Sequence, residues 1–194
     1  VRLSYFLWST MPDDELFALA DKGELNQTGT LTAQVQRMLL DPKASALVDN
    51  FAEQWLQLRI LDEITPDPAV FPEYKTELRD DLKRETKALF EHVMREDLPL
   101  REFLTARYTF VNERLAKHYG YPNVSGPEFR KVDVGETQRV GLLTHGSILT
   151  MTSNPNRTSP VKRGKWIMEV VLNTPPPPPP PNVQDLESTE VPPD

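Results

Sequence analysis

The chain has 194 residues, enough for one or two domains with a substantial hydrophobic core. Acidic residues outnumber basic ones by 29 to 22, and the formal net charge of −7 argues against a general nucleic-acid-binding protein. The sequence has no cysteine, which excludes disulfide bonds, cysteine-ligated metals and the covalent attachment of c-type haem to this chain. It also has no run of about 18 apolar residues, so we expect no membrane-spanning helix.

The first half of the sequence shows the periodicity of amphipathic helices. A helix is predicted over residues 2–8, and its abrupt start indicates a domain that is truncated at its N-terminus. Further helices are predicted from Pro12 to Gly23 and over residues 31–39. Asp41 and Pro42 then begin a helix with a broad apolar face, and several prolines between residues 66 and 72 predict a loop.

The rest of the sequence continues this pattern. The longest helix is predicted over residues 73–96, a short one over 100–106, an extended segment over 108–111, and a helix between Asn112 and Gly120. Residues 138–150 are apolar around most of the helix circumference, which predicts a buried helix or one broken near Gly146, and Ser159-Pro160 begins a last helix. Residues 129–134 could form one short strand, but no segment alternates like a sheet, so an all-α, irregular multi-helix fold is predicted.

Three regions follow from these elements. Residues 1–125 are expected to form a helical domain, and residues 126–174 a smaller helical region that packs on it. Residues 175–181 are all proline, which predicts a stiff polyproline spacer. Residues 182–194 are acidic and almost without apolar side chains, so a disordered tail is predicted there. A proline-rich ligand for a partner's groove is the alternative interpretation of the proline run.

A resemblance to known domains rests on two sets of residues. The first consists of RLSYFLWSTMPDDELFALADKGEL, QVQRMLLDPKASALVDNFAEQWLQL and FVNERLAKHYG, and it resembles a domain of unknown function from large planctomycete cytochrome c proteins. The adjacent domain of the same tandem resembles RVGLLTHGSILTMTSNPNRTSPVKRGKWIMEVVL followed by PPPPPPPNV. The resemblance implies an exported multidomain protein, in the periplasm or at the cell surface, with a c-type haem domain elsewhere in the polypeptide. It implies no catalytic residues.

The first candidate site residue is Glu85, which falls within the apolar stripe of the longest predicted helix. A buried carboxyl group needs a partner, and Arg163, close to the apolar face of the last helix, is the predicted one. This structural ion pair would join the two helical regions. The alternative is that Glu85 acts as a catalytic acid.

The second candidate is an anion or partner site in the segment 152–165, which contains no acidic residue. Its bases are Arg157, Lys162, Arg163 and Lys165. The plain alternative is an ordinary helix start at Ser159-Pro160 whose basic side chains bind loop carbonyls or a neighbouring acidic surface.

Metal and nucleophile chemistry have little support in the sequence. His92 and Glu96 have helical i, i+4 spacing but lack a third ligand, so no metal site is predicted. His145 is a weak catalytic candidate beside Ser147, because no G-x-S-x-G motif is present. His118 lies near a predicted helix end and needs no function there.

These observations favour a non-catalytic structural or docking module of a large exported protein that contains a c-type cytochrome domain. The chain itself would carry no haem, and its partners would be neighbouring domains of the same polypeptide. The rival hypothesis is an enzyme domain with an anion-binding pocket that acts on acidic or sulfated saccharides.

Overall fold

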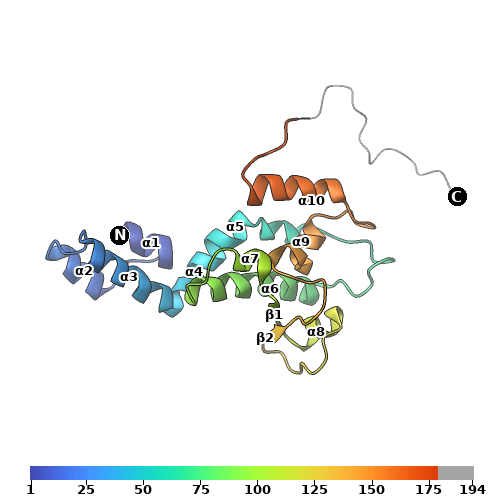
Figure 1. Cartoon of the computed structure of the whole chain (residues 1–194), viewed down its shortest axis with the longest axis horizontal. Helices are drawn as coiled ribbons and strands as arrows, with labels where there is room; N and C mark the ends of the chain where they lie inside the picture. Colours follow the sequence, from blue (N-terminus) through green and yellow to red (C-terminus); the bar gives the residue numbers. More distant parts are fainter. Residues whose placement is uncertain (179–194) are drawn as a thin grey trace.

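A computed structural model describes residues 1–178 of the chain (Figure 1). The predicted polyproline spacer extends past this range, and the predicted acidic tail at 182–194 lies wholly outside the described residues. Within the described range, no helix is long and apolar enough to cross a membrane. The first helical elements are α1 (Arg2–Trp8), α2 (Asp14–Asp21), α3 (Thr28–Leu40), η1 (Pro42–Ala44), α4 (Ser45–Leu47), η2 (Val48–Ala52), α5 (Glu53–Trp55) and η3 (Leu58–Asp62).

Helices α1 to α3 form one end of the molecule in Figure 1 and have a small core of their own. Trp8 lies in this core and donates a hydrogen bond from its indole nitrogen to the Met38 carbonyl oxygen, 2.9 Å away. Asp13 caps α2 through the Leu16 amide and pairs with Arg37 of α3 at 2.7 Å. The end is therefore held by the buried indole and by the ion pairs of Arg37 with Asp13 and Glu15.

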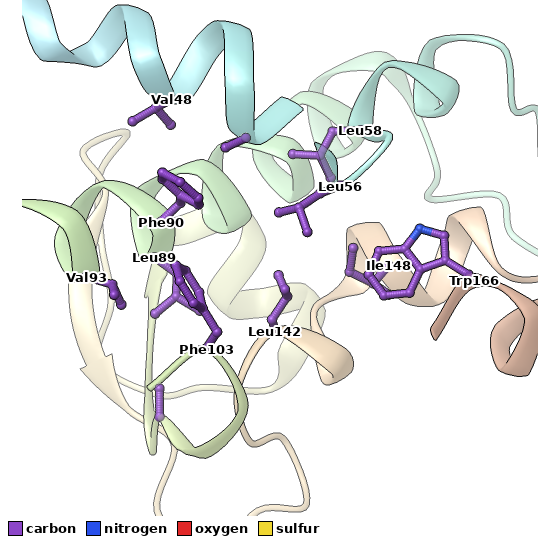
Figure 2. Close-up of a cluster of buried hydrophobic side chains, with 12 residues drawn as sticks. Val48, Leu56, Leu58, Leu89, Phe90, Val93, Phe103, Leu142, Ile148 and Trp166 are labelled. Atoms are coloured by element: carbon purple, nitrogen blue, oxygen red, sulfur yellow. The ribbon is translucent and has the colours of Figure 1, made fainter. Parts of the chain in front are cut away.

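The long helix α6 (Thr76–Arg95) runs through the centre of the fold and confirms the longest predicted helix. It is amphipathic, with buried leucines at 78, 82 and 89 on one stripe. The main core gathers around it: Figure 2 shows Leu89 and Phe90 of α6 facing Phe103 and Leu56, with Trp166 beside Ile148 at the other side. Burial of this face holds the elements on both sides of α6 together.

After α6 the chain forms α7 (Glu102–Thr105), β1 (Tyr108–Val111), α8 (Glu113–Tyr119), β2 (Arg130–Asp133), η4 (Leu142–Thr144), α9 (Gly146–Met151), α10 (Pro160–Trp166) and η5 (Ile167–Val171). Asn112 caps α8 by accepting a hydrogen bond from the Leu115 amide. The apolar segment 138–150 is broken immediately before Gly146, because His145 has extended backbone angles between η4 and α9. Ser159 caps the last helix as the sequence predicts.

The predicted all-α fold is wrong, because β1 and β2 pair as a two-stranded antiparallel sheet. Thr109 faces Val132 and Phe110 faces Lys131 in the register of this sheet. Thr109 and Val111 are buried, whereas β2 carries polar side chains and is mostly exposed, so it shows no alternation in sequence. The described part is thus helix-rich with a small sheet. This sheet joins residues on both sides of the predicted domain boundary at residue 125, and that boundary stays a prediction.

Candidate functional site

A closed polar cluster lies between α6, β1, α8 and α9, and Glu85 is at its centre. The Glu85 side chain is buried, with 1% of its residue surface exposed. Thr109 of β1 donates a hydrogen bond to Oε1 of Glu85 at 2.6 Å, and the hydroxyl of Tyr119 donates one to Oε2, also at 2.6 Å. Both carboxyl oxygens are therefore satisfied within the first of the two predicted helical regions.

His145 joins this cluster from the turn before α9. Its Nε2 atom lies 4.0 Å from Oε1 of Glu85, and its Nδ1 atom is hydrogen-bonded to the hydroxyl of Thr86 at 3.0 Å. The Thr86 hydroxyl is also 2.6 Å from that of Ser147. His145, Thr86 and Ser147 are all buried. A histidine, a serine and an acid are thus brought together, but each is bound to another member of the cluster.

Tyr119 connects the cluster to the backbone of α9. Its hydroxyl accepts a hydrogen bond from the Gly146 amide at 2.9 Å while it donates to Glu85. The guanidinium of Arg139 lies 3.9 Å from the centre of the Tyr119 ring and donates to the Thr144 carbonyl oxygen. Tyr119 is fixed on both of its hydrogen-bonding sides as a result.

Burial favours the uncharged forms of His145 and Tyr119. Burial lowers the pKa of His145, against the opposing effect of Glu85, and Arg139 lowers it further. Burial raises the pKa of Tyr119 well above its usual value, and the nearby Glu85 adds to this. Near neutral pH the imidazole is uncharged and the phenol is protonated.

The pH dependence of stability follows from the lowered pKa of His145. The unfolded chain binds more protons than the folded one once the pH falls through about 6.5, so the stability present above that pH is lost below it. We expect His145 to account for a loss of roughly 1 kcal/mol in the free energy of unfolding between pH 7.5 and 5.5. Urea unfolding at a series of pH values measures this.

His92 provides the comparison for that experiment, because burial and the nearby Lys131 also lower the pKa of His92. His145→Asn and His92→Asn should each remove part of the pH dependence. If His145→Asn keeps the full wild-type dependence, the neutral, buried state assigned to His145 is contradicted.

The structure gives Glu85 and Arg163 different partners from the ones that the sequence analysis expects. Arg163 donates from Nε to the Thr152 hydroxyl at 3.3 Å, and no ion pair between Glu85 and Arg163 is found within residues 1–178. The physical reason is that hydroxyl groups from β1 and α8 already occupy both oxygens of Glu85. Within the cluster, the two regions are connected by His145 and Gly146 instead.

The four bases of the predicted anion site do not converge on one point. Lys165 lies 3.7 Å from Glu169, four residues further along the same helical segment, and Arg163 binds Thr152. Lys162 is exposed near the start of α10, where its amide binds the Ser159 hydroxyl. Arg157 is the one among them that lines the pocket between α6, α8 and α9, together with Arg139. An anion site built on all four bases stays a prediction, and the four side chains do not surround one common point.

The remaining histidines have local partners. His92 lies 2.9 Å from the amino group of Lys131, next to the rings of Tyr108 and Phe110. His118 lies 3.7 Å from a Glu73 carboxyl oxygen. Within residues 1–178, no group of three His, Asp or Glu side chains is arranged to hold a metal ion.

Two segments of the chain match known protein families. The family PSD4, described as a protein of unknown function (DUF1592), matches residues 1–121, more than half of the chain. The chain belongs to the DUF1592 family. Residues 139–193 match a second family, PSCyt3, also described as a protein of unknown function (DUF1588). This tandem confirms the resemblance to domains of unknown function with cytochrome-associated names. No curated protein and no solved structure matches the chain.

The polar cluster lies where the DUF1592 segment meets the DUF1588 segment. Glu85, Thr109 and Tyr119 belong to the first, whereas His145 and Gly146 belong to the second. Glu85 and His145 were marked as candidates by the sequence, whereas Thr109, Tyr119 and Arg139 were not. In an extended segment Thr109 shares a face with Val111, two residues further on, and this spacing is the signal that could have marked Thr109 as inward-facing.

Proposed function

We propose that this DUF1592 chain is a non-catalytic structural and docking module of an exported, cytochrome-associated multidomain protein. The observation that carries the proposal is the closure of the polar cluster. Glu85, His145 and Ser147 are the side chains with the most catalytic potential, and each is at most 4% exposed. Since a general acid or nucleophile must reach its substrate, groups that bind one another in this way support a structural role.

The same closure disfavours the rival enzyme hypothesis in the form predicted. That hypothesis needs Glu85 to face a pocket with Arg157 and Arg163, so that an acidic or sulfated saccharide could reach it. Glu85 is instead bound at both oxygens by hydroxyl groups. A hydrogen-bonded acid in the interior stabilises the contact between α6, β1 and α8.

The proposed partner is a c-type haem domain of the same polypeptide, in the periplasm or at the cell surface. The cytochrome-associated family names and the resemblance to exported planctomycete proteins support this assignment. The absence of cysteine in the chain means that the haem would be attached to the partner and not here.

The docking role predicts measurable binding between separate polypeptides. We expect titration of the isotope-labelled haem domain with this chain to give saturable shifts of its amide resonances, because interfaces between domains of one protein are weak but specific. The control is an unrelated c-type haem domain of similar size and charge, which should show no such shifts. If the cognate haem domain shows no amide shifts at millimolar concentrations of this chain, the docking role is overturned.

A further inference from the structure

A pocket beside the closed cluster opens between α6, α8, α9 and the loop that follows η3, and it shares Tyr119, Arg139 and Gly146 with the cluster. Its volume is about 290 Å³, close to the size of pockets that hold small organic molecules. The Asp67 amide donates to the Pro155 carbonyl oxygen at 2.9 Å, which ties the loop to the turn before α10. In Figure 1 this loop lies on the side of α9 and α10, away from α1 to α3. The loop after η3 is therefore fixed in place as one wall of the pocket.

Most of the lining surface of the pocket is apolar. This apolar part includes the side chains of Ile64, Val70, Phe71, Leu78, Leu82 and Leu149. Val70 and Phe71 are roughly half exposed, although both are large apolar residues. A ligand with an apolar face would cover them and gain the free energy of burying that surface.

Arg157 gives the pocket a cation that lacks a protein partner. Its guanidinium makes no ion pair and no hydrogen bond with residues 1–178, and Arg139 is a second guanidinium in the same wall. Glu73 is the acidic side chain of the wall, and it lies beside His118 at 3.7 Å. Two arginines against one acid favour a ligand that carries a negative charge.

Tyr74 gives the pocket a polar group that also lacks a partner. Its hydroxyl oxygen is buried and has no hydrogen-bond partner in the described residues. Burial raises the pKa of Tyr74, so the hydroxyl stays protonated and can donate a hydrogen bond. Buried hydroxyl groups are rarely left without a partner, so a polar group of a ligand in the pocket would complete the hydrogen bonding of this one.

We infer that this pocket binds a small carboxylate with a flat apolar body, with Arg157 on the carboxylate and the Tyr74 hydroxyl on a polar substituent of the ligand. A sugar fits less well, because each of its hydroxyl groups needs a polar partner and most of the lining surface is apolar, although Ser153, Asn154 and Thr158 also line the pocket. The inference goes beyond the proposed docking role. It also leaves Glu85 structural, since that residue does not line this pocket.

The test is calorimetric titration of the whole chain with 4-hydroxybenzoate as the probe. We expect saturable binding that Arg157→Gln weakens roughly tenfold or more, because a charge-assisted hydrogen bond is lost, and that Tyr74→Phe weakens several-fold. The matched control is Arg101→Gln. Arg101 is an exposed arginine outside the pocket, also without an ion pair in residues 1–178, so its variant removes the same charge and should bind as the wild type does.

Three further probes separate charge from shape. 4-Hydroxybenzamide should bind at least tenfold more weakly than the acid, and glucuronate and inorganic sulfate more weakly still. No binding of 4-hydroxybenzoate at millimolar concentration, or equal binding by Arg157→Gln and wild type, overturns the site. If the chain binds glucuronate or sulfate more tightly than 4-hydroxybenzoate, the inferred ligand with a flat apolar body is wrong. Because Arg157 is exposed, the Arg157→Gln variant is expected to melt at a temperature close to that of the wild type. None of these outcomes depends on docking to a haem domain.

Discussion

Replacing Glu85 with alanine is expected to lower the free energy of unfolding by about 3–5 kcal/mol. The substitution removes the acceptor for two buried hydroxyl groups, those of Thr109 and Tyr119. It also leaves a cavity beside His145, which the surrounding helices can fill only in part. Urea unfolding of the whole chain, followed by far-UV circular dichroism, measures the change.

Two variants make that measurement specific. Glu85→Gln keeps the size of the side chain and one carbonyl acceptor, so a smaller loss of about 1–2 kcal/mol is expected. Glu77→Ala removes an exposed acid from the first turn of the same helix and should cost less than about 1 kcal/mol. A Glu85→Ala variant as stable as Glu77→Ala would contradict the structural role of the cluster and restore Glu85 as a candidate acid.

The helices were predictable because their signals are local. Helix α6 repeats apolar side chains at helical spacing over 20 residues, and Asp13, Asn112 and Ser159 are cap residues whose side chains act within three positions. The break at Gly146 was also visible, because a glycine interrupts a run of apolar residues.

The sheet and the partners of Glu85 were not predictable because they depend on distant residues. Strand β1 has only 4 residues, and its partner β2 lacks alternation, so the pairing of the two strands could not be predicted from periodicity. Tyr119 reaches Glu85 across 34 positions in sequence. Periodicity places Glu85 on an inward face, but it cannot say which of several donors meets it there. Arg163 and Tyr119 fit the requirement equally well until the packing of α8 against α6 is known.

Gly141 determines how closely the DUF1588 segment approaches the rest of the fold. Its amide donates to the Ala106 carbonyl oxygen at 3.0 Å, and its backbone angles are φ 62° and ψ −174°, a conformation nearly confined to glycine. A Cβ atom at this position would lie 2.6 Å from the Phe103 carbonyl oxygen and 2.6 Å from the Leu104 carbonyl carbon. The short segment around it carries Arg139 towards the pocket and His145 towards Glu85.

Gly141→Ala is therefore expected to cost about 3–5 kcal/mol, as the sum of backbone strain and a clash with backbone atoms that cannot rotate away. Two other glycines separate these causes. Gly135→Ala keeps the positive φ but has open space, so about 1–2 kcal/mol is expected, whereas Gly164→Ala lies in helix α10 with open space and should stabilise by about 0.5–1 kcal/mol. Thermal and urea unfolding of the three variants measure the series. A Gly141→Ala variant that loses no more stability than Gly135→Ala would show that residues 139–145 can move away from α7 without loss, and that the polar cluster does not depend on this close approach.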